Sequence, residues 1–346
     1  MTYAKPQKLQ SGDLIGIVSP SWGGPACFPH VYHEGVRVLT EELGFRVKEF
    51  KYTKAAASFI YDNPKLRAED INNAFLDTEV KGIIASIGGD DSVRILPFIN
   101  KEAVVANPKF FMGYSDTTTL LTYFNQLGLV TFYGPSVMAG CSQWSSFDDD
   151  FKKHIRLFLT GETLNYTYRE FKQWTDGYLD WSNEENTGKV KPFRSSDGWR
   201  FLQGSSIAIG ELFGGCLEVL EFMKGTEFWA SKDFWNNKIL FFETSEEKPT
   251  VENVKRMLRN YGSQGIFEKI SGVLFGRARG YSDSEKIELD KGIVTIIKNE
   301  FGQSELPIIS NMDFGHTDPQ LILPLGIKAE IDCRNKTLKL VESALQ

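Results

Sequence analysis

A serine stands where an apolar run meets a predicted helix, within the stretch GYSDT that begins at Gly113. The apolar residues before it predict a buried strand, and the spacing after it predicts a helix over 116–127. Gly113 permits a tight turn, and Ser115 nearly completes the GxSxG pattern of a nucleophile elbow, although Thr117 replaces the last glycine. Ser115 is therefore a candidate nucleophile. The alternative is that Ser115 or Asp116 simply caps the helix.

A nucleophilic serine needs a base, and the base needs a carboxylate that orients it. His316 follows a glycine in DFGHTDP and is expected on a loop that leaves an apolar segment, whereas His154 lies on a predicted helix and is expected at the surface. Glu243 ends the apolar run KILFFE, at the mouth of a predicted buried strand. Ser115, Glu243 and His316 are candidates for a catalytic triad. A solvated loop histidine and a capping glutamate are the alternatives.

The stretch SIGGDDS offers amide donors for an oxyanion. Gly88 and Gly89 follow another predicted strand, where glycine allows close backbone approach. The amides of Gly89 and Asp116 are the candidates, and an ordinary glycine turn is the alternative. The stretch contains neither GxxxxGK[ST] nor a spaced GxGxxG, which counts against a phosphate-binding loop.

Predicted strands and helices alternate with short connections through the first half of the chain, which indicates a parallel sheet covered by helices. SPSWGG, SIGGDDS and GYSDT stand at strand ends, where ligands bind in such sheets. The pattern breaks in a polar segment punctuated by tryptophans, which we interpret as a linker or a loop over a site. The expected organisation is an N-terminal α/β domain with the nucleophile over 1–165, a linker and Trp-bearing loop over 166–209, and a C-terminal domain with the acid and base over 210–346.

Composition limits the class of protein. The 346 residues are 41% hydrophobic and 24% charged, as in globular proteins, and the net charge of −6 without a long basic run argues against a nucleic-acid polymer as partner. The sequence has no apolar signal-peptide core and no run of 18 apolar residues, so we expect a cytoplasmic protein without a membrane partner. Four dispersed cysteines, without a CxxC pair or a histidine at metal spacing, predict neither a disulfide framework nor a metal site: Cys27, Cys141, Cys216 and Cys333.

Taken in order, SPSWGG, SIGGDDS, FMGYSDTTTLL, GGCLEVL, LFFETSEE, VLFGR and DFGHTDP resemble the LD-carboxypeptidase family of serine peptidases over essentially the whole chain. The resemblance is to the microcin C self-immunity branch rather than to the murein-tetrapeptide branch. It implies a Ser-Glu-His triad at Ser115, Glu243 and His316, with oxyanion donors at Gly89 and Asp116. It also implies a flavodoxin-like N-terminal domain, a smaller C-terminal α/β domain with its own sheet, a site between them, no cofactor and usually a homodimer.

The resemblance to the microcin C self-immunity branch depends on a long connecting loop with two tryptophans, which Trp174 and Trp181 match here. In that branch they help to hold the nucleotide base of an aminoacyl-nucleotide by stacking. The alternative is that both tryptophans pack the loop onto the domain. Lys248 and Arg277 are candidates for binding a substrate phosphate or carboxylate, with structural ion pairs as the alternative.

The resemblance predicts a serine peptidase or amidase that cleaves the amide of an aminoacyl-nucleotide toxin. One alternative is an LD-carboxypeptidase that releases terminal D-Ala from a murein tetrapeptide. A second alternative is a protein that binds a small ligand in the cleft without catalysis.

Overall fold

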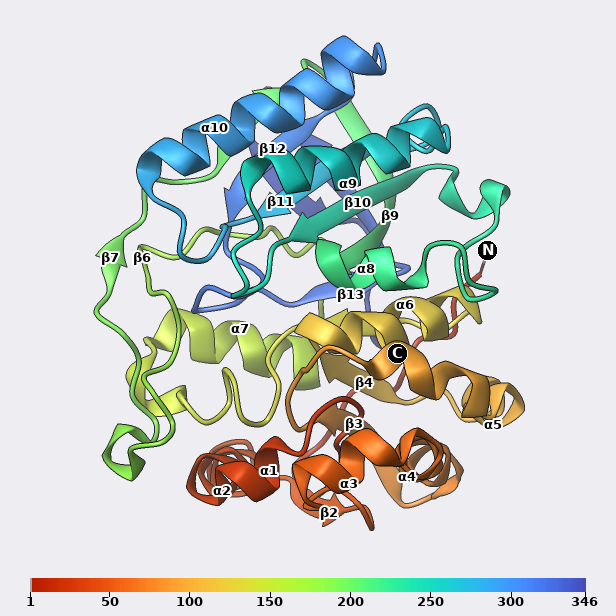
Figure 1. Cartoon of the computed structure of the whole chain (residues 1–346), viewed down its shortest axis with the longest axis vertical. Coiled ribbons are helices and arrows are strands. Elements are labelled where there is room, and N and C mark those ends of the chain that lie inside the picture. The colour runs from red at the N-terminus through yellow and green to blue at the C-terminus, as the bar shows by residue number, and fades with distance from the viewer. Residues whose placement is uncertain (1) are drawn as a thin grey trace.

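The apolar runs of the first half form the parallel strands of a six-stranded sheet in the computed structural model, which describes residues 2–346 (Figure 1). The strand order is β13-β5-β4-β3-β1-β2, and all neighbours are parallel except β13 and β5. The order 2-1-3-4-5 is that of flavodoxin-like sheets, so the predicted α/β class is confirmed. The strands are β1 (Leu14–Val18), β2 (Arg46–Glu49), β3 (Val80–Ala85), β4 (Phe110–Gly113), β5 (Thr131–Tyr133) and β13 (Leu323–Leu325).

Helices connect these strands and bury their apolar faces against the sheet. The helix predicted after Ser115 begins as a short 3₁₀ turn, η3 (Ser115–Thr117), and continues as α6. The stretch SVRILPF is a 3₁₀ helix, η2 (Ser92–Phe98), with Pro97 inside it. The α-helices of this half are α1 (Gly24–Cys27), α2 (Pro29–Arg37), α3 (Ala57–Asp62), α4 (Pro64–Leu76), α5 (Lys101–Ala106), α6 (Thr118–Gln126) and α7 (Asp149–Thr160).

A second sheet of seven strands has the order β15-β14-β9-β10-β11-β12-β8. Its central strands, β9 to β12, are parallel, and β14 with β15 forms an antiparallel hairpin near the C-terminus. The strands are β8 (Arg200–Gln203), β9 (Ile207–Cys216), β10 (Lys238–Glu243), β11 (Gly272–Gly276), β12 (Ile308–Met312), β14 (Lys328–Asp332) and β15 (Thr337–Leu340). The α-helices of this half are α8 (Leu217–Met223), α9 (Val251–Ser263) and α10 (Asp283–Val294).

Contacts between the two sheets place their strand ends together. Strand β13 lies within the C-terminal half of the chain but pairs with β5 of the first sheet. The amide of Cys216, at the end of β9, donates a hydrogen bond to Thr118 Oγ1 at 3.0 Å, on the first turn of α6. The end of β10 therefore faces the ends of β4 and β5, and loops from both halves meet there.

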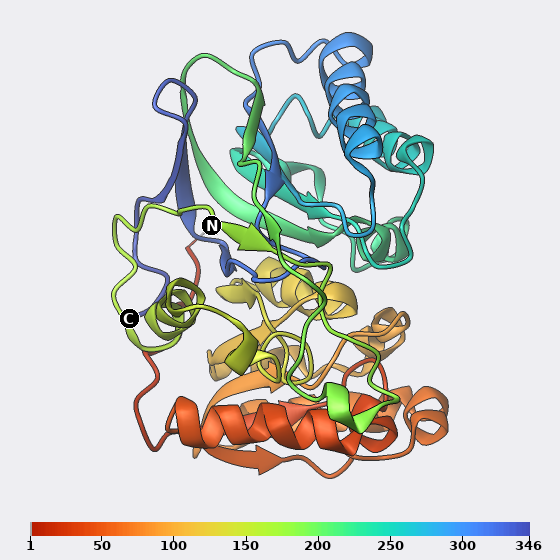
Figure 2. The same ribbon diagram turned by 90° about the vertical axis from the view of Figure 1, so that its left-hand side faces the viewer.

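The segment between the halves crosses from one to the other. It contains a short ribbon of β6 (Gln173–Trp174) and β7 (Arg194–Ser195), and a 3₁₀ turn, η5 (Glu184–Asn186). Figure 2 shows this green segment running along one side of the molecule from the second sheet toward the helices that follow β1. His30 Nε2 lies 3.0 Å from the carbonyl oxygen of Trp181, which ties the loop to the first half. Within residues 2–346, no helix has the length and apolar character needed to span a membrane.

Candidate active site

Three side chains that are far apart in the sequence form one chain of hydrogen-bond contacts. Ser115 Oγ lies 2.9 Å from His316 Nε2, and His316 Nδ1 lies 2.7 Å from Glu243 Oε2. Ser115 follows β4, Glu243 is the last residue of β10, and His316 lies on the loop between β12 and β13. Glu243 is fully buried and His316 is 4% exposed, so little water competes for these contacts. This is the arrangement of a nucleophile, a base and an orienting carboxylate.

The turn at Ser115 has the strained geometry of a nucleophile elbow. Ser115 has φ of 56°, in the left-handed region that L residues rarely adopt. Gly88 allows another loop to approach it, because a Cβ there would lie 2.8 Å from Ser115 Cβ. The serine hydroxyl is consequently presented at the strand end instead of satisfying a cap, and no side-chain capping bond occurs at this helix start.

The glycine before the histidine explains how Glu243 and His316 come so close. Gly315 has φ of 96°, and a Cβ there would lie 2.5 Å from Glu243 Oε2. Any other residue at this position would push the loop away from the carboxylate. On its other side, the ring of His316 packs edge-on against Tyr114, with centroids 5.1 Å apart.

Tyr133 is a site residue that the sequence analysis missed. Its buried hydroxyl donates a 2.5 Å hydrogen bond to Glu243 Oε1 and lies 3.4 Å from the amide of Ser115. Burial and the neighbouring Glu243 hold the pKa of Tyr133 well above its usual value, so the hydroxyl keeps the proton that it donates. One signal was available, since Tyr133 ends the apolar run TFY and β5 is the neighbour of β4.

A second missed residue, Glu246, contacts the histidine from the solvent side. Glu246 Oε2 lies 2.9 Å from His316 Nε2, and its side chain is 46% exposed. Burial alone would lower the pKa of His316, but the charges and hydrogen bonds of Glu243 and Glu246 outweigh it and raise the pKa to about 10. Burial alone would raise the pKa of Glu246, but the contact with His316 outweighs it and lowers this pKa to about 2. The two carboxylates therefore favour the imidazolium form, with a proton on each ring nitrogen.

The candidate oxyanion donors lie beside the serine. Gly89 lines a cavity of about 100 Å³ together with Ser115 and His316. The amide of Asp116 belongs to the first turn of a helix, where backbone donors have no preceding carbonyl within the helix. The buried carboxylate of Asp116 accepts a 2.9 Å hydrogen bond from the amide of Ser92, which fixes the glycine loop against the elbow.

The two tryptophans of the connecting loop lie in different surroundings, and only Trp181 lines the cavity at Ser115. Trp181 lines the cavity at Ser115 and stacks on Tyr178, with ring centroids 4.1 Å apart. Trp174 lies outside the lining of that cavity and is 3% exposed. The guanidinium of Arg277 lies 5.0 Å from the ring centroid of Trp174, and Lys286 Nζ lies 4.3 Å from it. Trp174 thus packs among cations of the C-terminal half in this structure.

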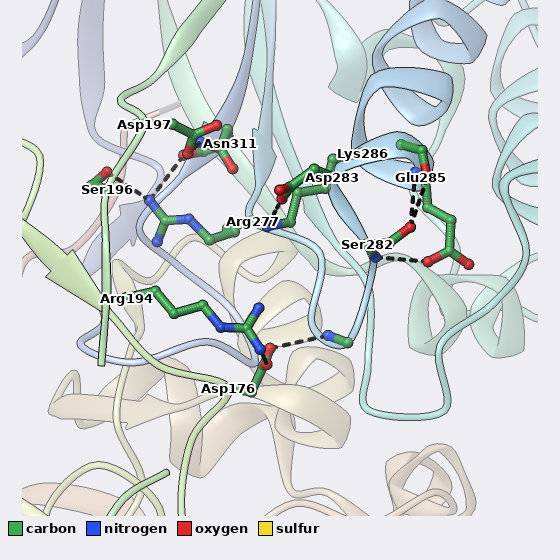
Figure 3. A network of polar contacts seen from close by, with 12 residues as sticks. Asp176, Arg194, Ser196, Asp197, Arg277, Ser282, Asp283, Glu285, Lys286 and Asn311 are labelled. Carbon is green, nitrogen blue, oxygen red and sulfur yellow. Dashed lines mark hydrogen bonds and ion pairs between the residues drawn. The ribbon is translucent and has the colours of Figure 1, made fainter. Parts of the chain in front are cut away.

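Arg277 and Lys248 likewise do not line the cavity at Ser115. Arg277 Nη1 lies 2.7 Å from Asp313 Oδ1, and both side chains are completely buried. Figure 3 shows the guanidinium of Arg277, whose Nη2 is directed toward Ser196. This contact belongs to a polar network that joins the crossing loop to the C-terminal half. Lys248 Nζ lies 2.9 Å from Glu285 Oε1. The geometry favours structural ion pairs for both residues, which was the alternative to substrate binding.

Comparison with known proteins identifies the relatives of this chain. Residues 15–134 match the LD-carboxypeptidase N-terminal domain, and residues 209–331 match the LD-carboxypeptidase C-terminal domain. A putative carboxypeptidase of Vibrio cholerae is 31% identical over 98% of both chains. The microcin C7 self-immunity protein MccF of Escherichia coli is 28% identical over 97% of this chain and 95% of its own. A probable murein peptide carboxypeptidase of Bacillus subtilis is 27% identical over 96% and 93%.

Solved structures that are similar to this chain include MccF itself and an MccF-like protein. An MccF-like protein from Streptococcus pneumoniae in complex with AMP has a TM-score of 0.84 and 30% identity, covering 95% of this chain and 98% of that chain. MccF in complex with glutamyl sulfamoyl guanosine has a TM-score of 0.84 and 28% identity, covering 99% of both chains. A further MccF structure contains aspartyl sulfamoyl adenosine, with a TM-score of 0.85, 28% identity and coverage of 99% and 100%.

The two-sheet fold and these relatives define the class of the protein, which is a serine hydrolase. More specifically, the chain belongs to the LD-carboxypeptidase family and is an MccF-like member of it.

Proposed function

We propose that Ser115 is the nucleophile of this hydrolase, His316 its general base and Glu243 the residue that orients the histidine. The unbroken contact from Ser115 Oγ through the imidazole to Glu243 is the observation that carries the proposal. Catalysis requires His316 with its proton on Nδ1, facing Glu243, and a free lone pair on Nε2, facing the serine. Tyr133 supports this arrangement by holding the other oxygen of Glu243.

The proposed reaction is hydrolysis of an amide through an acyl-enzyme. His316 Nε2 takes the proton of Ser115 as its Oγ attacks the carbonyl carbon, and the same nitrogen then gives that proton to the leaving nitrogen. The amides of Gly89 and Asp116 are the proposed donors to the tetrahedral oxyanion. Water, deprotonated by His316, then attacks the ester and releases the acid, which restores Ser115.

The proposed substrate is an aminoacyl-nucleotide or a close analogue. The relatives solved with glutamyl sulfamoyl guanosine and aspartyl sulfamoyl adenosine support this choice. An aromatic surface next to the nucleophile supports it as well, because Trp181 lines the cavity at Ser115 and stacking tolerates different bases. The resulting function is detoxification of such a compound by release of its amino acid.

The second candidate is release of terminal D-Ala from a murein tetrapeptide. The family description and the Bacillus subtilis relative support it. The two candidates share the same nucleophile and differ in the group that leaves, so one enzyme preparation can test both.

The test compares purified enzyme on an aminoacyl sulfamoyl-adenosine and on a tetrapeptide ending in D-Ala. We expect release of the amino acid from the first compound, abolished by Ser115→Ala and unchanged by Ser145→Ala, which alters an exposed serine elsewhere. Preferential release of D-Ala would establish the second candidate instead. Undiminished hydrolysis by the folded Ser115→Ala protein would refute the nucleophile.

The homodimer remains a prediction from the family resemblance, and the cytoplasmic location remains a prediction from the sequence. Light scattering coupled to size exclusion would give the mass in solution. A mass near twice the 39.1 kDa of the chain supports the dimer, and a mass near 39.1 kDa contradicts it.

A further inference from the structure

Glu246 faces the same nitrogen that must accept the proton of the nucleophile. Ser115 Oγ and Glu246 Oε2 each lie 2.9 Å from His316 Nε2. The nitrogen carries either one proton or one lone pair. In the catalytic form, with the proton of the ring on Nδ1, the carboxylate of Glu246 would face a lone pair and gain no hydrogen bond. The contact is attractive when Nε2 is also protonated, which is the form that cannot act as a base.

The surroundings of Glu246 are those of a binding group for a cation. Its side chain is 46% exposed and lines the cavity at the nucleophile, beside Gly89 and Trp181. Of the described residues that line this cavity, none is a lysine or an arginine. Glu246 follows the acid Glu243 by three residues, on the loop after β10, so the same strand end presents one carboxylate behind the histidine and another in front of it.

We propose that Glu246 binds an ammonium group that the substrate carries on the carbon next to its scissile carbonyl. This inference rests on the proposed function, because an aminoacyl-nucleotide has a free α-ammonium group at that position. A peptide cleaved at its C-terminal bond has an acylated nitrogen there, which carries no charge. Glu246 thereby selects aminoacyl amides over muropeptides.

Binding of the ammonium also prepares the base. When the carboxylate of Glu246 turns to the substrate cation, His316 loses the second of the two negative partners that raise its pKa. The imidazolium then releases its Nε2 proton to solvent, and the freed lone pair accepts the proton of Ser115 in the next step. The other charged groups that act on this nitrogen or on Glu246 are Glu243 on Nδ1, the buried Asp318, and Arg279, whose guanidinium lies 5.2 Å from the ring centroid of Tyr178.

The test uses two substrates that differ at one nitrogen: an aminoacyl sulfamoyl-adenosine with a free amine, and its N-acetyl derivative. Glu246→Gln removes the charge, and Glu247→Gln makes the same change on the exposed neighbouring residue. We expect Glu246→Gln to lower kcat/KM for the free amine by roughly ten- to a hundredfold, the usual value of one charge-assisted hydrogen bond. For the N-acetyl compound we expect no loss, because Glu246 then only holds His316 in the protonated form, and Glu247→Gln should leave the kinetics of both compounds unchanged.

Proton release gives a second readout. Calorimetric binding of the free amine to the Ser115→Ala protein, in buffers of different ionisation enthalpy, should show net proton release at about pH 7, where most of the α-amine is already protonated and takes up little. The additional change Glu246→Gln should abolish that release. Equal losses for the two substrates would overturn the proposal and make Glu246 a positioning residue for His316. Unchanged kinetics would overturn it as well.

Failure of this inference is distinguishable from failure of the proposed function. Suppose that the unmodified enzyme hydrolyses both compounds equally and that Ser115→Ala hydrolyses neither. This result would support Ser115 as the nucleophile and refute the proposed role of Glu246. If the unmodified enzyme hydrolyses neither compound, the proposed function and the role of Glu246 fall together.

Discussion

Replacing Tyr133 by phenylalanine should weaken both the fold and the catalytic arrangement. The substitution keeps the ring, which packs edge-on against Phe241 at 5.5 Å, and removes the hydroxyl that donates to Glu243. Because both residues are fully buried, one oxygen of the carboxylate then has neither the tyrosine nor water as a partner. A hydrogen bond to a charged group contributes about 1.5–3 kcal/mol. We expect a loss of this size in the free energy of unfolding.

Thermal and urea unfolding measure this loss against a matched control. A loss of 1.5–3 kcal/mol should lower Tm by roughly 2–4 °C in a protein of this size. Tyr261 is also a buried tyrosine, but its hydroxyl has no hydrogen-bond partner among residues 2–346, so Tyr261→Phe should be close to neutral.

The same substitution should reduce kcat by about tenfold with little change in KM, since a mobile Glu243 orients the histidine less well. Equal stability of Tyr133→Phe and Tyr261→Phe, together with an unchanged kcat, would refute the supporting role of Tyr133.

Two further predictions concern buried charges. Arg277→Met leaves Asp313 as a buried carboxylate without its ion-pair partner and should destabilise the fold by about 3–5 kcal/mol. An unchanged Tm together with weaker binding of the aminoacyl-nucleotide would show that Arg277 binds the substrate instead. His154 is neutral in the fold because burial lowers its pKa to about 3 from 6.5, so unfolding takes up a proton and stability should fall as pH decreases from about 6.5 toward 3. His154→Gln should flatten this dependence in urea titrations at several pH values, and an unchanged slope would contradict it.

The sequence could predict that the triad residues meet, because each of them is marked by a local sequence pattern. Ser115, Glu243 and the glycine before His316 each stand where an apolar run ends, and the carboxyl ends of parallel strands meet at one edge of a sheet. The register of the strands could not be predicted in the same way. Strand β13 pairs with the first sheet from within the C-terminal half, and no local pattern in LPL indicates its partner.

Tyr133 and Glu246 were missed because their contacts arise from neighbours in space. Tyr133 stands at a strand end, but nothing near it in the sequence indicates that its hydroxyl meets Glu243, which is 110 residues away. Arg277 and Asp313 carried a usable signal, since each directly follows one of two neighbouring parallel strands, β11 and β12. Two opposite charges at adjacent strand ends predict a pair, and this favours the structural role over substrate binding.

His154 was expected at the surface, and that prediction was wrong. It is 4% exposed, on the face of α7 that also buries Phe151, Ile155 and Phe158. The spacing from Phe151 is i, i+3, i+4 and i+7, which places the histidine within the apolar stripe. Its Nε2 accepts a 2.7 Å hydrogen bond from the amide of Ile322, so the ring satisfies a buried backbone donor beside β13.

The most direct test of the hydrolase mechanism is the intact mass of the protein after reaction with a fluorophosphonate. We predict one phosphonyl group for each chain, attached to Ser115, absent in Ser115→Ala and formed on the order of a thousandfold more slowly in His316→Ala. Labelling of a different residue, or equal rates with and without the imidazole of His316, would contradict the proposed nucleophile and base.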